Sequence, residues 1–194
     1  MAYFNSFYAA LAIVTVLYAV QLLRPLWISR FSWRTWTAIT AVMVVANVWM
    51  SYMQYRAWSS DKIGKFLLPP YQSWAYFFKY AGIEFFAPYI FSGLVALIAV
   101  CTARWLNRRF GERFFYPEEY VLMGTGLFVA GHPGWLAYAL LVMAVHVLWN
   151  LAATVLRKSA VRVSMRYLWL PLAFIAIIAV QLVHSAPWLK ALKI

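Results

Sequence analysis

Long apolar stretches alternate with short polar or basic segments along most of this chain. A helix of about 20 apolar residues crosses a hydrocarbon layer about 30 Å thick. A stretch at 118–131 follows Pro117. It ends before the turn His132-Pro133-Gly134, because Pro133 cannot continue a helix. The pattern predicts an all-α polytopic membrane protein, a single transmembrane domain over 1–194 with six transmembrane helices. These span about 7–23, 35–53, 85–102, 118–131, 135–156 and 167–183.

The segment between the second and third predicted spans is apolar and rich in aromatic residues. Residues 65–83 have the apolar character of a short seventh span, but Pro69-Pro70 and Lys79 argue against one. We expect an amphipathic helix at the membrane interface, because aromatic rings favour the headgroup level. Its anchors are Tyr71, Trp74, Tyr76, Phe77 and Phe78.

The charge distribution predicts an orientation in the membrane. Hydrophobic residues make up 65% of the chain and charged residues 11%, which leaves no segment for a soluble domain. Loops 24–34, 104–117 and 157–166 hold 11 of the 17 Lys and Arg residues, and alternate loops lie on one side of a bilayer. We therefore expect both termini outside, in a prokaryotic cytoplasmic membrane, since the first span reads as retained and no targeting signal is evident.

The net charge of +12 also bears on partners. In a soluble protein it would suggest nucleic acid, but here the basic residues lie in loops that set orientation. We expect the lipid bilayer and other membrane proteins as partners, and no nucleic acid.

One histidine lies near the middle of a predicted span. A polar ionisable group is costly at that depth, so His146 is a candidate ligand for a haem or a magnesium-centred pigment, with Asn150 one turn later on the same face. A neutral histidine hydrogen-bonded within the bundle is the alternative. Aromatic residues near span ends allow an isoprenoid or quinone groove, or simply an interfacial belt. The cofactor, if one binds, is not identified.

The single cysteine and the absence of known catalytic motifs limit the chemistry that the chain can perform. The lone Cys101 excludes an internal disulfide and a multi-cysteine metal site, so we expect no metal centre. No Walker loop, HExxH sequence or Ser-His-Asp constellation is present. The chain therefore carries no intact catalytic motif.

Four acidic residues remain as candidates. Glu118 and Glu119 follow Pro117, where acids complement a helix dipole, although paired carboxylates also suit general acid-base catalysis. Asp61 lies in a polar segment beside Lys62, which favours a solvated or capping role. Glu84 precedes the third span, with Lys79 as a candidate partner.

Two of these acids carry a resemblance to a known family. The Gly-rich segment from Glu119 through His132-Pro133-Gly134-Trp135 resembles the region after the second catalytic Asp of type IV prepilin peptidases, and Asp61 with the later Leu68-Pro69 is similar to the first. The resemblance implies an intramembrane aspartyl hydrolase in which Asp61 and Glu119 activate water. The family's Gly-x-Gly-Asp falls on Tyr116–Glu119, so both glycines are missing. The charge pattern also places the two acids on opposite sides.

A shorter match involves the same helix start. Pro117-Glu118-Glu119-Tyr120 resembles the Pro-x-Glu-Glu/Asp sequence of membrane lycopene-cyclase-type domains, with Tyr120 in place of the second acid. With no intact motif, and with Gly124 and Gly126 typical of close helix packing, our first hypothesis is a non-catalytic scaffold or accessory subunit. A prepilin peptidase-like hydrolase and a binder of an apolar cofactor through His146 are the alternatives.

Overall fold

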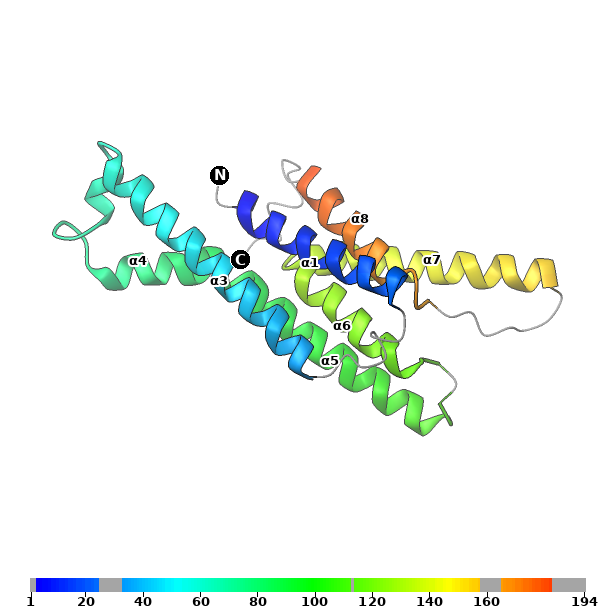
Figure 1. Cartoon of the computed structure of the whole chain (residues 1–194). Helices are drawn as coiled ribbons and strands as arrows, with labels where there is room; N and C mark the ends of the chain where they lie inside the picture. Colours follow the sequence, from blue (N-terminus) through cyan, green and yellow to red (C-terminus); the bar gives the residue numbers. More distant parts are fainter. Residues whose placement is uncertain (1–2, 25–32, 113, 158–164, 183–194) are drawn as a thin grey trace.

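A computed structural model describes residues 3–24, 33–112, 114–157 and 165–182 (Figure 1). Within these ranges every regular element is helical, which confirms the all-α class. η1 is a 3-10 turn and η2 a π-helical turn. The elements are α1 (Tyr3–Leu23), α3 (Trp33–Ser60), η1 (Gly64–Leu67), α4 (Trp74–Ala81), η2 (Gly82–Phe86), α5 (Ala87–Arg109), α6 (Pro117–Ala130), α7 (Gly134–Arg157) and α8 (Trp169–Leu182).

Four helical stretches among the described residues are long and apolar enough to cross a membrane. They are Ser6–Leu23, Arg34–Ser60, Trp74–Arg109 and Gly134–Val155. α6 and α8 have 14 residues each, or about 21 Å of helix, which is less than the thickness of the hydrocarbon layer. The chain is thus a helical membrane protein, and the predicted count of six spans is not confirmed.

The aromatic segment before α5 differs from its prediction. Instead of a separate interfacial helix, α4 continues through η2 into α5 as one helical stretch of 36 residues. Pro88 lacks an N–H donor, and the π-helical turn just before it lets the helix continue. α4 packs against the end of α3, where the Trp58 and Tyr80 ring centroids lie 4.7 Å apart. Figure 1 shows this pair of helices extending away from the other elements.

α6 lies at the centre of the helix packing. α6 contacts α1, α5, α7 and α8, and most of its residues after Glu118 are buried. A Cβ atom on Gly124 would lie 2.6 Å from Cζ2 of Trp36, and one on Gly126 would collide with the Tyr138 ring. The prediction that these glycines serve close packing is confirmed.

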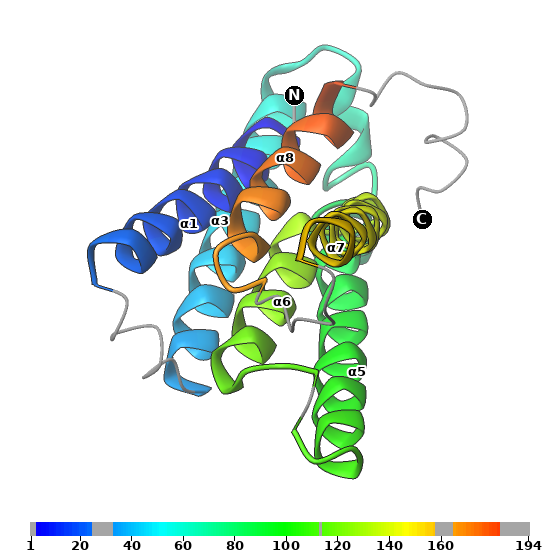
Figure 2. The same ribbon diagram turned by 90° about the vertical axis from the view of Figure 1, so that its right-hand side faces the viewer.

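Charged residues mark two ends of the bundle. α3 has no charged residue between Arg34 and Arg56. The helical stretch α4–α5 has none between Glu84 and Arg104. These intervals are about 32 and 28 Å long, which matches the hydrocarbon thickness. We call one end of the bundle the basic end; α1 and α5 end there, and α3 and α6 begin there. We call the other end the opposite end. The start of α1 and the end of α8 both lie at the opposite end, as Figures 1 and 2 show.

Candidate ligand cavity

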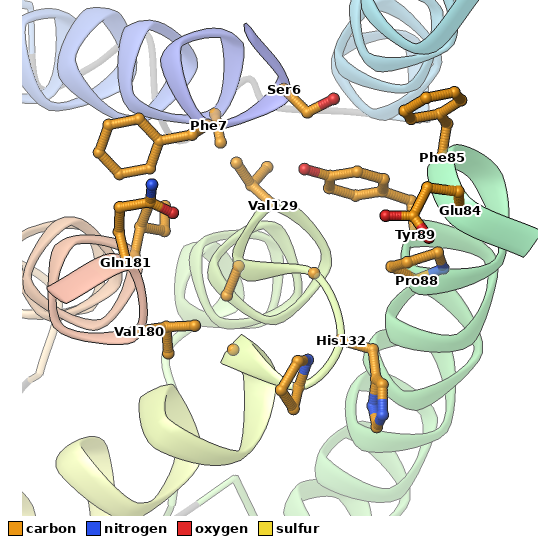
Figure 3. Close-up of a pocket in the computed structure, with 16 residues that line it drawn as sticks. Ser6, Phe7, Glu84, Phe85, Pro88, Tyr89, Val129, His132, Val180 and Gln181 are labelled. Atoms are coloured by element: carbon orange, nitrogen blue, oxygen red, sulfur yellow. The ribbon is translucent and has the colours of Figure 1, made fainter. Parts of the chain in front are cut away.

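A cavity of about 90 Å³ lies at the opposite end of the bundle. Its walls come from four separate segments: the start of α1, the η2–α5 junction, the α6–α7 turn and the end of α8 (Figure 3). Apolar side chains form much of the wall, including Phe7, Val129 and Ile177. Polar and titratable side chains also line it, namely Ser6, Glu84, Tyr89, His132 and Gln181.

The α6–α7 turn shapes one side of the cavity. Gly131 has φ +65°, a conformation that other residues rarely adopt, and a Cβ there would lie 3.3 Å from the Tyr89 ring. The His132 backbone N–H donates to the Pro88 carbonyl oxygen at 3.1 Å, which joins the turn to the start of α5. The turn is thereby held against the segment that carries Glu84.

The His132 ring has a defined hydrogen-bonding state. The Trp135 indole N–H donates to its Nδ1 at 3.1 Å, and the Phe91 ring packs edge-on at 5.0 Å between centroids. Because Nδ1 accepts a hydrogen bond, the neutral ring carries its proton on Nε2.

Among the lining residues that the structure describes, Glu84 contributes the only carboxylate. It is half-buried on η2, and Figure 3 shows it beside Phe85 and Tyr89. The predicted partner Lys79 does not form an ion pair with it. Within the described ranges the one ion pair joins Arg166 to Glu118 at 2.9 Å.

The structure does not bring Asp61 and Glu119 together. Asp61 follows the C-terminal end of α3, and Glu119 lies in the first turn of α6, at opposite ends of the bundle (Figures 1 and 2). Oδ2 of Asp61 accepts hydrogen bonds from the backbone N–H groups of Gly64 and Ile63 at 2.7 and 3.2 Å. Asp61 thus stabilises a local turn, as its capping interpretation predicts.

Glu119 is buried, with 2% of its surface exposed. Its carboxylate accepts from the backbone N–H groups of Tyr116 at 3.0 Å and Met165 at 2.9 Å. Together with the Arg166–Glu118 ion pair, these bonds join the start of α6 to the segment before α8. Arg113, the partner expected for these acids, lies outside the described residues. The helix-start interpretation of the acid pair is confirmed, and no water-activating pair is formed.

His146 and Asn150 lie on a part of α7 that is largely exposed. The Asn150 amide donates to the His146 backbone carbonyl at 2.7 Å and not to its ring. The His146 side chain is exposed and lies outside the cavity, and Figure 1 shows this part of α7 extending clear of the other helices. In the described ranges no group of three or more His, Cys, Asp or Glu residues is arranged to hold a metal ion.

The sequence reasoning missed the cavity. Glu84 and His132 are far apart in the chain and share no motif, so the sequence indicates only the local setting of each residue. One signal was available: both lie next to long charge-free stretches, on the side away from the basic loops. That signal places them at one level of the membrane but does not make them neighbours.

Comparisons of this chain with known protein families, with characterised proteins and with solved structures gave no match. The resemblances to prepilin peptidases and lycopene cyclases are therefore neither confirmed nor refuted by relatives.

Proposed function

We propose that this membrane protein binds the polar head of an amphiphilic molecule in the cavity at the opposite end. The observation that carries the proposal is the convergence of Glu84, His132 and Gln181, from three segments, on one partly apolar cavity. A concave, mostly apolar site with a few convergent polar groups is the usual form of a small-molecule site. The π-helical turn that carries Glu84 supports it, since such turns are frequent at functional sites.

The size of the cavity favours a head group over a whole ligand. Sites for drug-sized molecules enclose roughly 300–1,000 Å³, whereas this cavity holds about 90 Å³. A molecule with a long apolar tail would place its head in the cavity and leave the tail against the apolar helix surfaces outside.

The level of the cavity in the membrane fits such a ligand. Glu84 lies at the limit of the charge-free part of its helix, where headgroups meet the hydrocarbon. By the positive-inside rule the basic end faces the cytoplasm, which assigns the cavity to the outer leaflet. In this proposal His132 and Glu84, and not His146, are the polar contacts of the ligand. Isoprenoids and quinones are among the candidate ligands.

Filling the cavity tests this proposal. Ala130 lines it, so Ala130→Phe introduces a ring into the space, and Ala144→Phe on the exposed part of α7 is the matched control. The measurement is mass spectrometry of the small molecules extracted from each purified protein. We expect an amphiphile with the wild type and the control, and its loss from Ala130→Phe. Equal retention by all three proteins would contradict the proposal.

A second candidate function is that of a scaffold or accessory subunit, as the sequence suggested. It is supported by α7 from Met143 onward, where Met143, Val147, Leu148, Trp149 and Leu151 are all exposed and apolar. In a membrane this surface is covered by lipid or by a helix of another protein. The two coverings predict different cross-linking patterns.

Cysteine cross-linking in native membranes separates these coverings. In a Cys101→Ser background, Val147→Cys tests α7, and Ile98→Cys on the exposed face of α5 is the control. A defined adduct with another protein from Val147→Cys alone supports the accessory-subunit function. The same diffuse products from both sites would show that α7 faces lipid.

A further inference from the structure

We infer that the head group bound in the cavity is cationic, an amine or a quaternary ammonium group. The inference rests on the proposed function and deepens it by naming the ligand's charge. The first support for a cationic head group is the kind of charged residue that lines the cavity. Lys and Arg outnumber Asp and Glu by 17 to 5 in the chain, yet the lining formed by the described residues includes Glu84 and no Lys or Arg.

The second support is the environment of Glu84. The part of the chain that the structure describes places no basic side chain within ion-pair distance of this carboxylate. A carboxylate at the edge of the hydrocarbon is costly without a compensating charge or donor. An anionic head would add repulsion, and an uncharged head would leave the charge without a counterion. A cationic head supplies that counterion.

The third support is aromatic. Phe7, Phe85 and Tyr89 line the same cavity, and Figure 3 shows the last two flanking Glu84. Ring faces attract ammonium groups, and aromatic residues combined with an acid are typical of sites for quaternary ammonium ligands. The Ser6 hydroxyl is engaged elsewhere, because it donates to the Asn47 amide oxygen at 2.8 Å.

The experiment measures protection of a cysteine in the cavity wall. In full-length Cys101→Ser protein, Val180→Cys, at a lining position with no polar role, reports occupancy through its rate of labelling by a thiol reagent. Three probes share a 12-carbon tail and differ in the head: dodecyltrimethylammonium, its uncharged 3,3-dimethylbutyl analogue and dodecyl phosphate. We expect the ammonium probe to slow labelling at concentrations where the other two do not.

Substitutions of Glu84 then assign the selectivity. Glu84→Gln removes the charge and should weaken protection by the ammonium probe about tenfold, whereas Glu84→Asp keeps the charge and should retain most of it. Asp61→Asn, which removes an acid outside the cavity, is the control and should change nothing. Retained thermal melting temperatures confirm that each variant is folded.

The outcomes separate this inference from the proposed function. Equal protection by all three probes, unchanged in Glu84→Gln but lost in Ala130→Phe, overturns the cationic head and leaves head-group binding intact. Protection by none of the probes, or protection that persists in Ala130→Phe, overturns both.

Discussion

Glutamates occur at both ends of the bundle, but they differ in burial and in the partners that the chain provides. At the basic end Glu119 is 2% exposed and accepts two backbone hydrogen bonds, while Glu118 pairs with Arg166. At the opposite end Glu84 is half-buried at a cavity, and no described basic residue pairs with it. The first pair of acids stabilises the fold, whereas Glu84 is available to a ligand. A carboxylate near a membrane edge is therefore a candidate for ligand binding only when the chain itself supplies no hydrogen-bond donor or counterion for it.

The two ends of the bundle should lie on opposite sides of the membrane, so that thiol labelling of intact cells is all or none. In a Cys101→Ser background, single cysteines at the exposed positions Ser60 and Tyr116 report the opposite and the basic end. A membrane-impermeant thiol reagent on intact cells should label Ser60→Cys and not Tyr116→Cys, because basic loops face the cytoplasm. After lysis both should react. Labelling of Tyr116→Cys alone in intact cells would invert the orientation and assign the cavity to the inner leaflet.

Removal of each glutamate should affect stability unequally. Glu119→Ala leaves the N–H of Met165 without its acceptor and removes the bond to Tyr116, so we expect a loss of about 3 kcal/mol in unfolding free energy. Glu84→Gln should change it by less than about 0.5 kcal/mol. Denaturant unfolding of both variants in the same detergent measures the difference. Equal losses would show that Glu84 is also a structural residue.

The smallest expected effect is at the histidine of the cavity. Trp135→Phe removes the indole donor to Nδ1 of His132, and we expect a loss of about 1 kcal/mol in stability. With the ring free to change tautomer and orientation, retention of the amphiphile should also fall. Phe91→Leu, which removes a ring contact to His132 but no hydrogen bond, is the control. A similar effect of both substitutions would show that packing alone positions the ring.

Several local features could be predicted because their causes are local. Proline and two acids after a polar segment specify a helix start at Pro117, and the structure has α6 beginning there with Glu119 capping it. Asp61 also forms its turn with residues two and three positions later. Short-range hydrogen bonds of this kind depend only on neighbouring residues.

Other features differ from their predictions or are not confirmed. The segment at 65–83 was expected to be separate from the third span, but the apolar pattern carries α4 through η2 into α5. The span predicted at 118–131 is not confirmed, because α6 has 14 residues and is surrounded by other helices. Hydropathy does not distinguish a helix buried among other helices from one buried in lipid, because both environments are apolar.

The sequence by itself determined that the chain is a helical membrane protein, where its charge-free stretches lie, and which of its loops are basic. These properties follow from the cost of placing charge in hydrocarbon, which acts on each residue separately. Only the tertiary structure decided that Glu84, His132 and Gln181 share one cavity and that Asp61 and Glu119 do not meet. Such proximity depends on how whole helices pack, and packing is specified by many weak contacts between distant residues, such as Gly126 with Tyr138, that leave no local pattern.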